Sequence, residues 1–395
     1  MKLRWFMLLL LVVGELVLAQ DTISPRIRQR LVAVMERFGE EPDQAIAALD
    51  RLATARSISD SDLGFVRRQQ AALLIEEERN AEALSLLQST LSGQPDTYLP
   101  ALRLLLGQLL LMEGDAEGAA RELQVWSEQE PDPHPVELSV LGYAYLQVER
   151  FDAAVPVFER LLAISEAKND QWYEVLAFAY VQTGRSADAI ALLDSVIASK
   201  PEEARWWRQL SNIYLLLEDY QAGAANLAIA ALITGLDHAE SRRLAGLFSM
   251  INMPAEGAEV LAAARHTFPD DHGYDDQMLL GELWMLARET DLALNAFEEA
   301  QLLAADGEPA LRIAQLHLQW ERYDEAQQAL RLAIQHYGEN TPEEIWYLLA
   351  IVEINRDDMN AAGTAVARLD EQGEYGERRA ALERYIADRG EGQGS

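Results

Sequence analysis

The sequence predicts an all-α fold, a right-handed superhelical solenoid of stacked antiparallel helix pairs. Two observations lead to this fold class. Helical patterns return along most of the chain every 33 to 36 residues, and residues of fixed size return in phase with them. One such unit is RWWRQLSNIYLLLEDYQAGAANLAIAAL, from Arg205 to Leu232. It reads as a helix, a polar break at Glu218-Asp219, and a second helix rich in small residues.

One residue, usually large, marks the late part of each first helix, and a small residue follows it nine positions later. The marker residues are Leu74, Leu110, Tyr145, Tyr180, Tyr214, Phe248, Trp284, His317 and Glu353. The small residues are Ala83, Ala119, Ala154, Ala189, Gly223, Gly257, Ala293, Ala326 and Ala362. A small residue lets the second helix approach the first closely, where a longer side chain would clash. The two columns therefore predict a helical hairpin in each repeat.

A third column, 21 residues after the marker, predicts where each second helix ends. Its members are Pro95, Pro131, Pro201 and Pro269, with Gly235 and Gly338 at two further repeats. Proline cannot continue a helix, and glycine commonly ends one, so both turn the chain into the next unit. The TPEE sequence at residues 341–344 predicts a capping box, with Thr341 at the N-cap and Pro342 at the first helical position.

This pattern resembles the tetratricopeptide repeat, a helix–turn–helix unit with a period near 34 residues, and the resemblance covers about Gly64 to Leu369. Gly107, Gly142 and Gly281 stand at the eighth position of their repeats, as in that family. The predicted organisation is a signal peptide (1–19), a degenerate helical hairpin (20–63), an array of about nine repeats (64–373), a polar capping helix (374–389) and a flexible tail (390–395).

The composition excludes several classes of function. The formal net charge of −32 disfavours binding to nucleic acid, which needs a basic surface, and adsorption to anionic lipid. The chain contains no cysteine, so it forms no disulfide, thiolate metal site or cysteine nucleophile. A hydrophobic fraction of 49% is ordinary for a folded chain and too high for a disordered one.

The N-terminal sequence MKLRWFMLLLLVVGELVLAQ predicts export. Lys2 and Arg4 form a positive segment, an apolar stretch follows, and small residues at its end are typical of a cleavage site. The run from Phe6 to Ala19 is too short to span a bilayer as a helix. We expect cleavage after Ala19 and a periplasmic protein without membrane insertion. An uncleaved anchor is the alternative.

No motif for an enzyme is present. The sequence lacks a glycine-rich phosphate loop, a nucleophile elbow and a paired-histidine metal helix. One inter-repeat loop, HTFPDDHGYDDQ, gathers His266, Asp270, Asp271, His272, Asp275 and Asp276. Its proline and glycine favour a solvated turn, with a metal or ligand carrier as the alternative. We therefore predict no catalytic residue, no cofactor and no metal.

The resemblance to tetratricopeptide proteins implies a concave surface lined by first helices, which binds a protein or peptide. Carried onto this chain, the predicted groove residues are Tyr143, Phe178, Arg205, Arg208, Asn212, Arg242, Met278 and Tyr347. The three arginines suit a clamp for an acidic segment of a partner. The alternative is an internal ladder, in which Glu174 pairs with Arg208.

Phrases such as LWMLARETDLALNAFEEA and LRIAQLHLQWERYDEAQQAL resemble the exported tetratricopeptide proteins found with TonB–ExbB–ExbD systems. That resemblance implies a non-enzymatic periplasmic scaffold in TonB-dependent uptake. Its partners would be TonB–ExbB–ExbD or outer-membrane transporter components. A second hypothesis is an adaptor for cell-envelope assembly, in exopolysaccharide or peptidoglycan machinery.

Overall fold

The computed structural model describes residues 23–38, 41–56, 58–93, 99–166, 169–303 and 306–392. Within these residues the regular structure is helical, with 21 α-helices and one short 3₁₀ turn, which confirms the predicted fold class. The predicted signal peptide, Pro95 and the last three residues lie outside the described residues. The chain divides into two compact units, residues 1–195 and 196–395.

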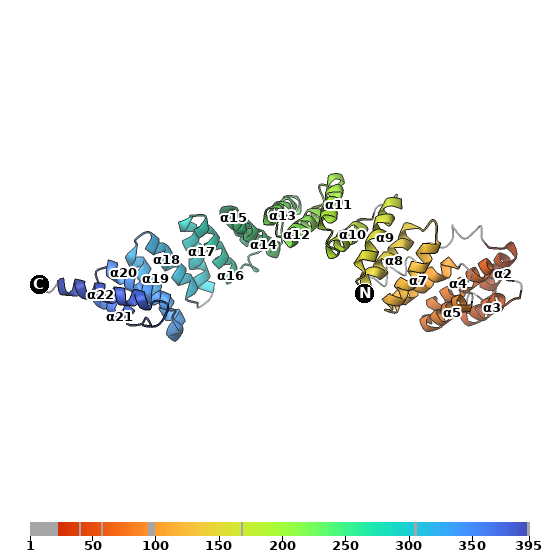
Figure 1. The fold of residues 1–395 in the computed structure, drawn as a ribbon, viewed down its shortest axis with the longest axis horizontal. Coiled ribbons are helices and arrows are strands. Elements are labelled where there is room, and N and C mark those ends of the chain that lie inside the picture. Colours follow the sequence, from red (N-terminus) through yellow and green to blue (C-terminus); the bar gives the residue numbers. More distant parts are fainter. Residues whose placement is uncertain are drawn as a thin grey trace. The chain divides into compact units, whose positions relative to one another are not determined.

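The first unit begins with the predicted N-terminal hairpin and continues with repeated helix pairs (Figure 1). Its helices are α2 (Pro25–Phe38), α3 (Pro42–Ala53), α4 (Asp60–Glu76), α5 (Asn80–Gly93), α6 (Pro100–Met112), α7 (Ala116–Gln129), α8 (Pro135–Gln147), α9 (Phe151–Ile164) and α10 (Asp170–Gln182). The division between the two units falls inside α11 (Ser186–Ser199).

The second unit contains five helix pairs and a final helix that closes the stack. Its helices are α12 (Ala204–Leu216), α13 (Tyr220–Thr234), α14 (His238–Met250), α15 (Pro254–Thr267), α16 (Tyr274–Leu286), α17 (Thr290–Leu303), α18 (Glu308–Gln319), α19 (Tyr323–Tyr337), η1 (Gly338–Asn340), α20 (Glu343–Asn355), α21 (Met359–Val366) and α22 (Gly376–Gly392). The predicted capping helix is α22, whose Leu382 and Ile386 pack against the last hydrophobic cluster.

The turn inside each of the nine repeats is closed by the same backbone hydrogen bond. The N–H five residues after the marker donates to the marker's carbonyl, at 2.7–2.9 Å, as from Asp219 to Tyr214. The residue before this donor has a positive φ, for example 59° at Glu218. This combination is a Schellman motif, which satisfies carbonyl groups that the end of a helix leaves unpaired. The marker column therefore records where each first helix stops.

The small residue column lies at the contact between the paired helices. Every alanine of this column has an exposed fraction of 0%, and both of its glycines are buried. A Cβ atom added at Gly257 would lie 2.6 Å from the backbone oxygen of Ala245, so only glycine fits this approach. The eighth-position glycines face large side chains in the same way, as Gly142 does with Phe158.

In the described repeats, the second helices end close to the proline or glycine that lies 21 residues after the marker. Pro131, Pro201 and Pro269 each lie two residues after the last residue of α7, α11 and α15. Gly235 and Gly338 directly follow α13 and α19 and have positive φ.

The predicted capping box at Thr341 is wrong. Pro342 has an extended ψ of 145°, and α20 begins only at Glu343. The Thr341 hydroxyl instead donates to the carbonyl of Gly338 at 2.6 Å, so it is turned away from the helix.

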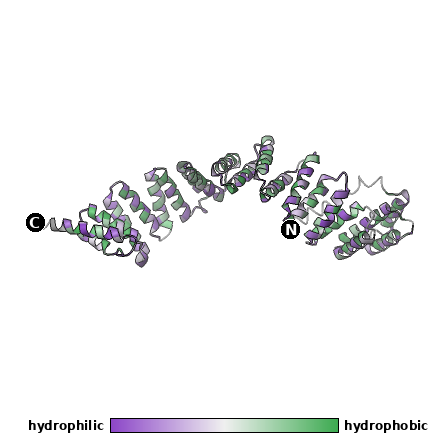
Figure 2. Ribbon diagram, in the orientation of Figure 1, coloured by the Kyte–Doolittle hydropathy of each residue, from purple (hydrophilic) through white to green (hydrophobic). Residues whose placement is uncertain are grey.

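Hydrophobic and hydrophilic residues are mixed along most helices, as expected of helices that pack on one side and meet solvent on another (Figure 2). The helix α6 has no exposed residue. The N-terminal hairpin buries Ile27 and Leu49 in one cluster with Val66 of α4. None of the helices in the described residues is long and apolar enough to cross a bilayer.

The close approach of paired helices predicts that Ala326→Leu destabilises the second unit. The Ala326 side chain has no exposed surface, so the added methyl groups force the two helices apart at a cost of about 1–3 kcal/mol. Urea unfolding measures the change. Gln328→Leu, at an exposed position of the same helix, is the control and should change the unfolding free energy by no more than about 0.5 kcal/mol. Equal effects of the two substitutions would contradict this packing.

Candidate functional site

The first unit contributes two of the predicted groove residues, and both are aromatic. Tyr143 of α8 is half-buried and packs edge-on against Phe158, with ring centroids 5.6 Å apart. Burial raises the pKa of the Tyr143 hydroxyl to about 12, with a smaller contribution from the charge of Glu174. Phe178 of α10 is 50% exposed and packs edge-on against Phe151 at 5.6 Å. Phe178 therefore has apolar surface that a partner could contact, whereas it is mainly the edge of the Tyr143 ring that is accessible.

The three arginines of the second unit each contact a carboxylate of the chain itself. Arg208 of α12 lies 2.6 Å from Glu240 and also donates to the carbonyl of Gly235. Arg242 of α14 lies 3.5 Å from Asp276. Arg205 lies 2.5 Å from Glu203 of the preceding loop. The hydrogen bonds that Arg208 donates to Glu240 raise the pKa of Arg208.

Two of these pairs occupy equivalent positions and form an internal arginine ladder. Glu240 and Asp276 are each the third residue of a first helix, α14 and α16. Each carboxylate also accepts a backbone hydrogen bond that caps its own helix, from Asp237 and Gly273 respectively. The ladder therefore joins each arginine to the N-terminus of the following first helix. The sequence reading named Glu174, a residue of the first unit, as the partner of Arg208 and did not name Glu240.

The remaining predicted groove residues take part in local packing. Asn212 is exposed and accepts a hydrogen bond from Arg243 at 3.1 Å. Met278 is half-buried against the last hydrophobic cluster of the second unit. Tyr347 stacks on Tyr375 at 5.1 Å and lies beneath the guanidinium of Arg378 on α22. The capping helix therefore occupies one face of Tyr347.

Sequence reasoning missed an exposed apolar row on the second unit, formed by Leu216, Met250 and Leu286. Their exposed fractions are 69%, 58% and 59%. Each lies two residues after a marker, at the end of α12, α14 and α16. This equivalence places the three side chains on the same face of consecutive repeats. The sequence contained a signal for this row. The position two residues after the marker is polar in the two preceding repeats, at Gln147 and Gln182, and becomes apolar in these three.

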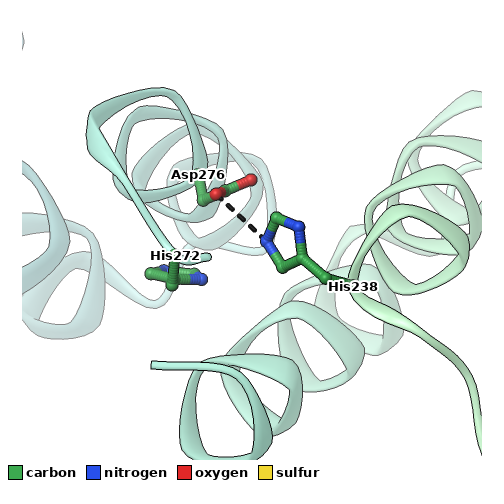
Figure 3. Close-up of side chains that lie close together, drawn as sticks. All are labelled: His238, His272 and Asp276. Carbon is green, nitrogen blue, oxygen red and sulfur yellow. Dashed lines mark ion pairs between the residues drawn. The ribbon is translucent and has the colours of Figure 1, made fainter. Parts of the chain in front are cut away.

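The inter-repeat loop that the sequence singled out is divided by the structure into two parts. His266 of α15, Asp270 and Asp271 of the turn, and Asp275 of α16 are exposed, so the loop is shorter than the sequence suggested. His272 and Asp276 instead point inward and meet His238, the first residue of α14 (Figure 3). We call His238, His272 and Asp276 the histidine cluster. One ligand atom from each residue lies within 4.8 Å of the others.

The histidine cluster is partly shielded from solvent, with the His238 side chain 20% exposed. Asp276 is 3% exposed, and the two imidazole rings meet edge-on with centroids 6.2 Å apart. His238 Nε2 lies 3.2 Å from a carboxylate oxygen of Asp276. Burial lowers the pKa of His272, and the neighbouring charges of Asp276 and Arg265 act in opposite directions on it. A neutral imidazole and a carboxylate are ligands for a transition-metal ion.

Comparisons with known proteins agree with the helical repeats. Family models described as tetratricopeptide repeat match residues 74–138 and 145–213, and residues 309–335. The chain therefore contains tetratricopeptide repeats over these residues, and such repeats typically form non-catalytic scaffolds for protein interaction. No curated protein matches the chain, so the narrower resemblance to TonB-associated proteins stays a prediction.

Several solved structures show partial similarity to the chain. The C-terminal part of a tetratricopeptide repeat protein from Cytophaga hutchinsonii is 11% identical, covers 62% of this chain and 99% of its own, and has a TM-score of 0.46. A tetratricopeptide repeat protein from Parabacteroides merdae is 14% identical, with coverages of 65% and 98% and a TM-score of 0.36. YrrB, described as having an unusual peptide-binding site, is 15% identical, with coverages of 51% and 92% and a TM-score of 0.38.

The arginine ladder predicts that Arg208 stabilises the second unit. Arg208 and Glu240 are both partly buried, so their coupling should lie between that of an exposed ion pair and that of a buried charged hydrogen bond, at about 1 kcal/mol. A double-mutant cycle with Arg208→Gln and Glu240→Gln, followed by urea unfolding, measures it. Glutamine at residue 240 retains an acceptor for the helix cap. A coupling free energy of zero would refute a structural role for this pair.

Proposed function

We propose that the protein is a non-enzymatic scaffold that binds an apolar segment of a partner protein along the first helices of its second unit. The observation that carries this proposal is the apolar row of Leu216, Met250 and Leu286, each more than half exposed at the same position of consecutive repeats. Exposed apolar side chains that line up on one face are typical of a protein interaction site.

Polar groups on the same helices can orient such a segment. Arg205 and Asn212 of α12 and Arg242 of α14 have exposed side chains, so they can contact a partner that extends from the apolar row toward the starts of these helices. Arg208 should contribute less to partner binding, because its guanidinium already contacts Glu240 and Gly235. In the first unit, the open face of Phe178 and the edge of Tyr143 are the corresponding contacts.

The proposed cellular setting is the periplasm, and the proposed partners are components of a TonB–ExbB–ExbD system or an outer-membrane transporter. Support comes from the sequence: the basic and apolar residues at positions 2–19 and the phrases shared with exported tetratricopeptide proteins. Export should yield a mature chain that begins at Gln20. N-terminal sequencing of the protein from an envelope fraction tests this, and a chain that still begins at Met1 would refute it.

The apolar row predicts the effect of a triple variant, Leu216→Gln, Met250→Gln and Leu286→Gln. Because the three side chains are largely exposed, the variant should fold and keep its helical circular dichroism. It should lose its partner, with affinity reduced at least tenfold, equivalent to about 1.4 kcal/mol. The measurement is capture from an envelope extract by the immobilised chain, with partners identified by mass spectrometry.

Two leucines on second helices provide a matched control. Leu232 of α13 and Leu302 of α17 are 88% and 86% exposed, and they too occupy equivalent positions of their repeats. The double variant Leu232→Gln, Leu302→Gln also removes exposed apolar surface, but from second helices. It should capture the same partner as the unmodified chain. If the triple variant also captures it, or if only the control variant fails, the proposed surface is wrong.

A further inference from the structure

The histidine cluster brings together residues that are distant in sequence and belong to successive repeats. His238 opens α14, His272 lies in the loop before α16, and Asp276 lies in the first turn of α16. The three ligand atoms lie within 4.8 Å of one another. A tetrahedral zinc site with bonds of about 2.0–2.1 Å places its ligand atoms roughly 3.4 Å apart. Modest rotations of the side chains therefore close the cluster around one ion.

Four polar atoms of the cluster are buried and make no hydrogen bond. Both ring nitrogens of His272, Nε2 of His238 and Oδ1 of Asp276 lack contact with solvent and lack a hydrogen bond. Nε2 of His238 and Oδ1 of Asp276 each have a charged neighbour, Oδ2 of Asp276 at 3.2 Å and Arg242 at 3.5 Å. Both ring nitrogens of His272 remain without a hydrogen bond, and because buried polar groups in folded proteins are almost always satisfied, they point to a ligand at this place.

We propose that His238, His272 and Asp276 bind a divalent transition-metal ion of the zinc class. Two imidazoles and a carboxylate suit zinc, whereas calcium and magnesium are bound through oxygen alone. The three residues leave a fourth position for water or for a group of another molecule. The ion would join α14 to α16 and so fasten one repeat to the next. This property is separate from the partner surface proposed above.

The surroundings of Asp276 orient it for this role. The N–H of Gly273 donates to Oδ2 at 3.1 Å, which fixes the carboxylate at the start of α16. Arg242 lies 3.5 Å from Oδ1, so its guanidinium can hold this oxygen while Oδ2 faces His238. Groups around a metal site commonly orient its ligands in this way. Arg242 is 45% exposed, so it can also move away as an ion enters.

Zinc titration of the untagged full-length chain, stripped with a chelator, tests the proposal. Isothermal calorimetry with zinc chloride should give one ion per chain. His272→Ala and Asp276→Asn should each weaken binding at least tenfold, which is the scale expected for the loss of a group from a metal site. His266→Ala is the matched control, because His266 is an exposed histidine beside the same loop and should leave zinc binding unchanged.

Circular dichroism separates lost binding from lost folding, since Asp276 also caps α16 and His272 does not take part in the cap. A second readout is cobalt, whose visible absorption reports tetrahedral coordination and should disappear in His272→Ala. The proposal is overturned if the unmodified chain shows no saturable zinc binding. It is also overturned if a folded His272→Ala variant binds zinc as tightly as the unmodified chain.

Discussion

The close approach of two helices within each repeat is the constraint on which the rest of this structure depends. The small residue column makes that approach possible, because its alanines have no exposed surface and its glycines touch the opposite helix. Once the two helices are this close, the turn between them has little freedom, and the same Schellman hydrogen bond closes it in every repeat. The position of each first helix, and of every side chain on it, follows from this geometry.

The functional surfaces lie at opposite ends of the first helices. The apolar row is formed where α12, α14 and α16 end, whereas the arginine ladder and the histidine cluster lie where α14 and α16 begin. A helix of 13 residues such as α14 separates its two ends by about 20 Å. In the proposed arrangement, a partner segment on the apolar row and an ion in the histidine cluster would occupy opposite ends of these helices.

Much of the fold could be predicted from the sequence, because small residues recur at a fixed spacing along the chain. Ala326 and Gly257 follow their markers at the same spacing, and both proved to lie between helices. The helix start predicted at Thr341 was wrong by one residue, because the Thr341 hydroxyl bonds to Gly338 of the preceding 3₁₀ turn and Pro342 has an extended ψ of 145°. The left-handed backbone at Glu218 could not be predicted either, because its residue type is unusual for that conformation.

The candidate sites were less predictable than the fold, because they depend on contacts between repeats. The loop pattern named His272 and Asp276, but His238 joins them only after two hairpins stack. Arg208 was predicted as a groove residue, yet its partner Glu240 comes from the next first helix and was not predicted.

We have proposed that partners bind along the first helices of the second unit. Hydrogen–deuterium exchange with and without a captured partner tests it most directly: we predict added protection in α12, α14 and α16, and protection confined to α13, α15 and α17 would contradict it.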